Sequence, residues 1–179
     1  RVTKDGTVST YSTGARSEPF RIPNYPVFDK EGYLYVSDSG EMYTNNWSRI
    51  SKENGYICKI PPGGGEGSVW NRDLSQFPNG LCLSPDNEYL YVVISMIRPR
   101  IDRVEIKSDG TSGSIETVVE LPGTVPDGLA FDIAGNLYIS CYRPDRVYRL
   151  DSKGELIILA EEPTGHLISA PTNVAFCGQ

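Results

Sequence analysis

The sequence predicts an all-β chain assembled from the blades of a β-propeller. Three observations lead to this prediction: a segment that repeats at similar spacing, strand-like alternation inside each repeat, and the lack of any ten-residue window with a 3.6-residue apolar period. The composition agrees, because 11 Tyr, 18 Gly and 13 Pro residues against 2 Met favour strands joined by tight turns.

Each repeat opens with a Pro-Asn or Pro-Asp pair, followed by a short apolar strand, a polar turn and a strand of the Leu-Tyr-Val type. Three copies span 23–36, 78–92 and 126–139, and a fourth opens at 171 with Pro-Thr-Asn. The polar residues at the head of the copies are Asn24, Asn79, Asp127 and Asn173, at successive separations of 55, 48 and 46 residues. Periods of ~40–50 residues with four strands each are typical of propeller blades.

The rest of each unit supplies the outer half of a blade. We expect alternating third strands at 56–60, 103–106 and 146–150, and outer strands at 118–121 and 156–159. The first unit is longer, and the polar stretch 39–54 accounts for this as a loop insertion. The glycine-rich run 62–67 lacks the Lys-Ser/Thr of a phosphate loop and is predicted to be a flexible connector.

These units predict a single propeller domain that does not close on itself. Residues 1–22 would end one blade, 23–77, 78–125 and 126–170 would form three blades, and 171–179 would start the next. Propellers close into rings, and the smallest common ring has four blades. We therefore expect this chain to be part of a longer polypeptide, or to form a homodimer that completes one ring.

Charge and cysteine usage narrow the function classes. The net charge is −6, and the longest basic cluster is Arg98-Pro99-Arg100, which argues against nucleic acid as a partner. No apolar run approaches the ~20 residues of a membrane span. The cysteines form no C-x-x-C pair, and Cys82 and Cys177 lie in apolar runs typical of buried thiols. This favours a cytoplasmic location without disulfides, although the sequence begins at Arg1 and leaves a removed leader open.

The repeated polar residues are the candidate site. Residues at the same point of successive blades meet around the central channel, so the amide and carboxylate oxygens of the four repeats would form a ring suited to a hard divalent cation. The alternative is that each Pro-Asn-Gly or Pro-Asp-Gly only shapes a turn. His166 is the only histidine and lies in a polar turn, so hydrolysis would have to use a metal and carboxylates.

At these residues the chain resembles the gluconolactonase, regucalcin (senescence marker protein) and luciferin-regenerating enzyme family of six-bladed β-propellers. The matching segments are 35–40 (Tyr-Val-Ser-Asp-Ser-Gly), 77–81 (Phe-Pro-Asn-Gly-Leu), 90–92, 126–128 (Pro-Asp-Gly), 141–143 with 146–147, and 171–176 (Pro-Thr-Asn-Val-Ala-Phe). The resemblance implies that this chain covers three to four of six blades, about 15 strands against about 24 for the ring.

The resemblance also implies a site. Asn79 and Asp127 would bind a divalent metal, Ca²⁺ first and Mg²⁺, Mn²⁺ or Zn²⁺ as alternatives, with Asp127 also acting as the catalytic base and Asn24 contacting the substrate. Two departures bear on this expectation. Tyr25 follows Asn24 where the family has Asp or Gly, and the family's metal-binding Glu belongs to a Glu-Gly-Pro motif that residues 1–179 do not contain.

The activity implied is metal-assisted hydrolysis of a small-molecule lactone, with these residues inactive when alone. Two other readings stay open. One is a non-catalytic calcium-binding or scaffold propeller. The other is a different propeller ester hydrolase, paraoxonase-like or strictosidine-synthase-like, the latter without need of the metal.

Overall fold

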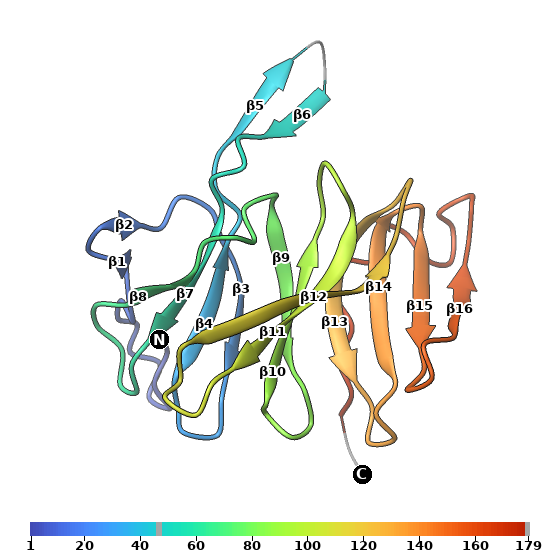
Figure 1. Ribbon diagram of the computed structural model, residues 1–179. Helices are drawn as coiled ribbons and strands as arrows, with labels where there is room; N and C mark the ends of the chain where they lie inside the picture. Colours follow the sequence, from blue (N-terminus) through green and yellow to red (C-terminus); the bar gives the residue numbers. More distant parts are fainter. Residues whose placement is uncertain (46–47, 178–179) are drawn as a thin grey trace.

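Three four-stranded antiparallel sheets lie side by side in the computed structural model, which describes residues 1–45 and 48–177 (Figure 1). The first blade is β3 (Pro23–Phe28), β4 (Leu34–Asp38), β7 (Tyr56–Ile60) and β8 (Ser68–Asn71). The second is β9 (Pro78–Leu83), β10 (Tyr89–Ile94), β11 (Arg100–Ile106) and β12 (Ser112–Glu120). The third is β13 (Val125–Phe131), β14 (Leu137–Arg143), β15 (Arg146–Leu150) and β16 (Leu156–Glu161). Each sheet pairs its strands in chain order from the inner to the outer edge.

The hairpins follow from a recurring Asp-x-x-Gly turn. In the turns at 29–32, 132–135 and 151–154, the glycine N–H donates to the aspartate carbonyl over 3.0–3.1 Å, and φ of the glycine is +82° to +87°. Each aspartate carboxylate also accepts backbone N–H bonds from the far side of its turn, at 2.8–2.9 Å. Only glycine adopts that φ at little cost, so these turns fix where the next strand begins.

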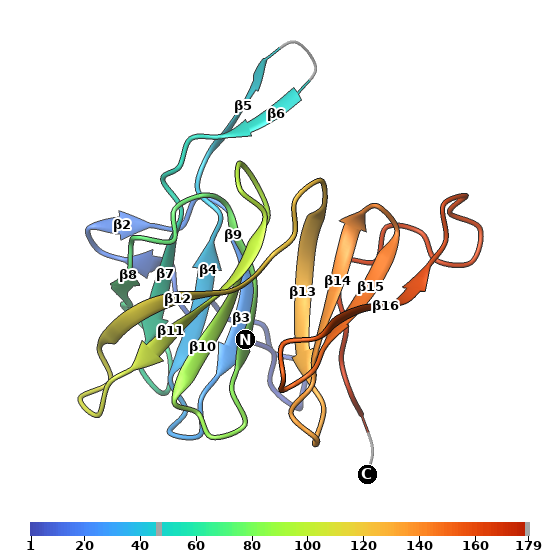
Figure 2. The ribbon, with the colours of Figure 1, turned by 45° about the vertical axis from the view of Figure 1, so that its right-hand side comes forward.

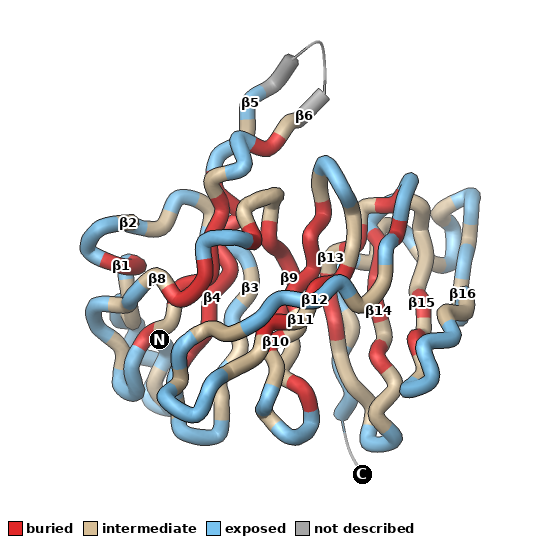
Figure 3. Tube along the Cα trace, viewed as in Figure 1, coloured by how far each residue is buried: buried red, intermediate tan, exposed pale blue. Residues whose placement is uncertain are grey.

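The hydrophobic core lies between neighbouring blades. In β10, Leu90, Val92 and Ile94 pack toward the first blade, and the alternate residues Tyr91 and Val93 pack toward the third. A strand that is apolar on both faces must be covered on both faces, as the buried middle strands in Figure 3 show. This two-sided burial stacks the sheets into an arc whose inner edge is β3, β9 and β13.

The strands at 56–60 and 146–150 have the predicted bounds, whereas β11, β12 and β16 are longer than predicted. Two predictions were wrong. The insertion at 39–54 is not simply a loop, because it forms a hairpin of β5 (Met42–Asn45) and β6 (Ser48–Ser51) that projects beyond the sheets (Figure 2). Cys177 is exposed rather than buried, because residues 171–177 run beside β13 without pairing as a strand.

The N-terminal residues form β1 (Gly14–Ala15), β2 (Glu18–Pro19) and a bridge between Val2 and Val8. Cys82 is half-buried, and no disulfide forms within the described residues. Residues 1–45 and 48–177 contain no helix long and apolar enough to cross a membrane.

Inner strands of successive blades approach closely at two glycines. A Cβ atom added to Gly80 in β9 would lie 2.3 Å from the carbonyl oxygen of Asp127 in β13. One added to Gly128 would lie 2.8 Å from the Cα of Asn173. Backbone atoms cannot move aside as a flexible side chain can, so the glycines of the Pro-Asn-Gly and Pro-Asp-Gly motifs set the spacing between blades.

Gly80→Ala is therefore expected to lower the free energy of unfolding by about 1–3 kcal/mol, as overpacking does. The comparison variant is Gly113→Ala: the three atoms nearest to its added Cβ all belong to the Glu105 side chain, which can move in part, so it should cost less than Gly80→Ala. Chemical denaturation of both variants checks this. Equal stabilities of the two variants would contradict the proposed backbone contact.

The two end faces of the arc, one on the first blade and one on the third, expose apolar residues. On the first blade a cavity of about 270 Å³ opens between Phe20, Pro26, Leu34 and Val36. On the third blade Tyr138 packs edge-to-face on Phe176, which is itself 56% exposed. In a closed propeller the next blades would cover these faces.

The 179-residue chain on its own is therefore expected to associate with itself or to bind a hydrophobic dye, because both faces are uncovered. Light scattering and dye fluorescence measure this. A cooperative melt of a monomer that binds no dye would contradict the expectation of an open ring.

Candidate functional site

The heads of the three repeats lie at one end of the arc. Pro23 pairs with Asp38, Pro78 with Ile94 and Val125 with Arg143, so each inner strand begins where the second strand of its blade finishes. β9 contacts both β3 and β13. Asn24, Asn79 and Asp127, on three adjacent inner strands, therefore surround the same end of the channel, from which the β5–β6 hairpin also projects (Figures 1 and 2).

Asn79 is buried, with 5% of its surface exposed. Its Nδ2 donates a hydrogen bond to Ser95 Oγ at 3.1 Å. Its Oδ1 is buried and has no hydrogen-bond partner among the residues that the structure describes. A buried acceptor without a partner costs about 1–3 kcal/mol, so this oxygen is available to accept a hydrogen bond or to bind a cation.

Asp127 is half-buried beside Asn79. Burial raises the pKa of its carboxyl group to about 6, and hydrogen bonding from the Asn79 side chain offsets part of the rise. The carboxylate is therefore ionised at neutral pH but holds a proton more strongly than an exposed aspartate. These are properties of a general base that works near pH 7.

The other two repeat positions differ. Asn24 is exposed, and its Nδ2 donates to Ser39 Oγ at 3.0 Å. Asn173 Oδ1 accepts the Tyr25 hydroxyl at 3.0 Å and the Val174 N–H at 2.8 Å, so it is already used. Tyr25, the departure from the family pattern, thus links the first blade to the fourth repeat.

Asn79 Oδ1 and the Asp127 carboxylate fit part of a site for a hard divalent cation, because both offer oxygen and neither is matched by a cation. Within residues 1–45 and 48–177, no three side chains of His, Cys, Asp or Glu gather into a metal-binding group. These two side chains supply at most three oxygens, fewer than the ~6–8 ligands that Ca²⁺ takes.

Sequence reasoning missed three residues that hold the site. Asp38 is fully buried and accepts the N–H groups of Arg21, at 2.6 Å, and Ile22, at 3.2 Å, which fixes the approach to β3. Ser39 and Ser95 each lie five residues after the Leu of the repeated Leu-Tyr-Val strand. That shared position was a signal in the sequence that could have found them.

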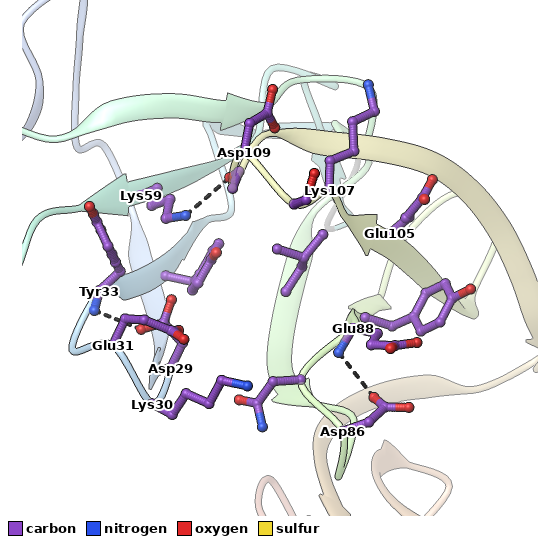
Figure 4. A pocket seen from close by; sticks show the side chains of 16 residues that line it. Asp29, Lys30, Glu31, Tyr33, Lys59, Asp86, Glu88, Glu105, Lys107 and Asp109 are labelled. Atoms are coloured by element: carbon purple, nitrogen blue, oxygen red, sulfur yellow. Dashed lines mark hydrogen bonds between the residues drawn. The ribbon is translucent and has the colours of Figure 1, made fainter.

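A cavity of about 830 Å³ lies at the opposite end of the first two blades, among the turns that join their strands (Figure 4). Lys59 Nζ donates to Gly110 O at 3.0 Å and lies over the ring of Tyr33. The carboxylates of Asp29 and Asp86 accept backbone N–H groups of their own turns. These charged side chains of the cavity thus stabilise the turns around it. None of the predicted site residues lines the cavity.

The sequence matches the family described as SMP-30/Gluconolactonase/LRE-like region over residues 2–179. The chain belongs to this family. A gluconolactonase of Zymomonas mobilis is 31% identical over 165 residues, which cover 86% of this chain and 45% of the relative. A regucalcin of Xenopus laevis is 32% identical over 152 residues, 83% of this chain and 49% of the relative. The chain spans about half the length of these curated relatives.

Solved structures of the family share the fold. A gluconolactonase of Xanthomonas campestris superposes with a TM-score of 0.77 at 23% identity, over 98% of this chain and 57% of that one. A regucalcin of Agrobacterium tumefaciens, described as a calcium-binding protein, gives 0.56 at 21% identity, over 74% and 42%. These likenesses, with the three four-stranded sheets, confirm the prediction of an all-β, partial propeller.

The raised pKa of Asp127 predicts how stability depends on pH without metal. The folded state keeps the proton up to about pH 6, whereas an unfolded aspartate loses it near its ordinary value of 3.8. The free energy of unfolding should therefore fall as pH rises through this window, by roughly 2 kcal/mol.

Asp127→Asn removes the ionisable group and should remove this contribution, so the metal-free variant should be the more stable protein at pH 7. Urea denaturation in chelator across pH 4–7 measures the effect, as the free energy of unfolding of the wild type minus that of the variant. A difference that does not change with pH would contradict the burial of this carboxyl group.

Proposed function

We propose that this chain carries part of the active site of a metal-dependent lactone hydrolase. The observation that carries the proposal is the buried, unpartnered Oδ1 of Asn79 beside the desolvated carboxylate of Asp127 at the channel end. Membership of the gluconolactonase and regucalcin family supports the same reaction class.

Asn79 Oδ1 and Asp127 would hold the divalent cation, Ca²⁺ first and Mg²⁺, Mn²⁺ or Zn²⁺ as alternatives. When bound, the cation supplies Lewis-acid polarisation of the lactone carbonyl. The remaining ligands would come from water and from blades outside residues 1–179, in the same polypeptide or in a second copy.

Asp127 would take the proton from the attacking water. Burial raises the pKa of this group in the metal-free site, whereas a bound cation would lower it, so Asp127 would have to bind the cation through one oxygen and leave the other free for the water. Asn24 is exposed at the same end of the channel, where its amide can hydrogen-bond a polar lactone. Tyr25 shapes the wall beside it through its bond to Asn173.

A second candidate is a calcium-binding propeller without catalysis. It is favoured by the description of the Agrobacterium tumefaciens regucalcin as a calcium-binding protein, and it would use the same two oxygen ligands. A strictosidine-synthase-like hydrolase is a third, which needs no metal. Lactone turnover with and without chelator separates the three.

Asp127→Ala is expected to abolish calcium binding and to lower lactone turnover by at least about 100-fold, because it removes both a ligand and the base. Asn79→Ala should mainly weaken calcium binding, and Asn24→Ala should mainly raise KM for the lactone. Calorimetric titration with calcium and a pH-indicator assay on the complete natural polypeptide measure these effects.

The control is Glu31→Ala, which removes one exposed negative charge at the opposite end of the first blade. It should change neither quantity. Turnover by Asp127→Ala at the rate of the parent protein would rule out Asp127 as the base.

A further inference from the structure

Two buried serines repeat the same pair of hydrogen bonds in the first and second blades. We propose that Ser39 and Ser95 are positioning residues that orient the side-chain amides of Asn24 and Asn79, so that each amide oxygen faces the channel. This inference rests on the proposed function for its consequence, and on the hydrogen bonds of the two serines for its geometry.

The hydrogen bonds of the Ser95 hydroxyl group fix the orientation of the Asn79 side-chain amide. Its hydroxyl has a single hydrogen, which it donates to the carbonyl oxygen of Pro126 at 2.6 Å. Ser95 Oγ can then only accept, and it accepts Asn79 Nδ2 at 3.1 Å. Ser95 is 2% exposed, so water does not compete readily. The NH₂ end of the amide must point to Ser95, which leaves Oδ1 free as a ligand.

Ser39 repeats this arrangement one blade earlier. It donates to the carbonyl oxygen of Pro78 at 2.8 Å and accepts Asn24 Nδ2 at 3.0 Å. Its side chain is fully buried. Two copies with the same donors and acceptors, in blades of different sequence, point to a requirement rather than to chance packing.

The third blade supports this interpretation because it has no serine at this position. The residue at the position of Ser39 and Ser95 is Tyr142, which is 41% exposed. The head of that repeat is Asp127, whose two carboxylate oxygens are equivalent and need no orientation. The serine thus accompanies an amide and is replaced where the repeat carries a carboxylate.

Each chain of two hydrogen bonds, from the asparagine through the serine to a proline carbonyl oxygen, forms a relay that reaches into the next blade. The acceptors Pro78 and Pro126 directly precede Asn79 and Asp127. Ser95 therefore ties the amide of one proposed ligand to the backbone beside the other. This bond fixes how far Asn79 lies from Asp127, in addition to which end of its amide is presented.

Ser95→Ala in the complete natural polypeptide should weaken calcium binding by about 10–100-fold, as loss of an outer partner of a metal ligand does. Ser95→Thr keeps the hydroxyl and should retain most of the affinity. Ser39→Ala is the comparison variant: because Ser39 orients Asn24 and reaches Asn79 only through the Pro78 carbonyl oxygen, it should mainly raise KM for the lactone and lower the calcium affinity less than Ser95→Ala does. Calorimetry with calcium and thermal melts in chelator separate loss of affinity from loss of fold.

The decisive comparison uses Asn79→Asp, which makes the ligand symmetric as in the third blade. In that background Ser95→Ala should cost clearly less calcium affinity, because there is no amide to orient and only the bond to the Pro126 carbonyl oxygen is lost. An equal loss in both backgrounds would overturn the proposal, as would a folded Ser95→Ala protein with the affinity of the parent.

The orientation is measurable without calcium. In NMR spectra of the metal-free protein, the Asn79 side-chain NH₂ should be protected from hydrogen exchange, and Ser95→Ala should reduce this protection. A protein that binds no calcium but shows this effect would contradict the proposed function and leave the orientation by Ser95 intact. An unprotected Asn79 NH₂ in the parent would overturn the relay itself.

Discussion

Burial of both faces of each blade is the constraint on which the rest of this structure depends. In β10, Val92 and its neighbour Val93 point to opposite faces, and both are completely buried. A sheet with two apolar faces cannot be stable alone, so each blade requires a neighbour on either side. Stacking of this kind brings the inner strands together at one edge. Gly80 and Gly128 then allow their backbones to approach closely enough for the strand heads to share one end of the channel.

The same packing creates the chemistry of the candidate site. It removes water from Asp127, which raises the pKa of the carboxyl group, and it buries Asn79 Oδ1 without a partner. Both effects cost stability in the metal-free protein. Elsewhere in the described residues a buried carboxylate is fully matched: Asp102, for example, accepts Arg100 Nε at 2.8 Å and Thr117 Oγ1 at 2.8 Å. The contrast between Asp102 and Asp127 distinguishes a structural carboxylate from one available to a ligand.

The sequence predicted what is periodic and local. The strands at 56–60 and 146–150 alternate clearly, and the Pro-Asn and Pro-Asp heads repeat in register. The β5–β6 hairpin was missed because its polar sequence has no alternation and is specified by pairing between its own strands. The burial predicted for Cys177 was wrong because an apolar run is buried only where another element covers it. The serine relays join residues 31 and 39 positions apart, a separation that no local pattern encodes.

These observations connect the fold to the candidate site through a single kind of contact. Ser95 bonds to the amide of Asn79 in its own blade and to the carbonyl oxygen of Pro126 in the next. The relative position of the two proposed ligands is therefore set by a blade-to-blade hydrogen bond, in addition to the rigidity of either blade. A displacement of the third blade against the second would both stretch this bond and rotate the Asn79 amide. Residues farther from the channel, such as Tyr148 and Leu150 of β15 in the core between these blades, therefore contribute to the geometry of the site through the spacing of β9 and β13.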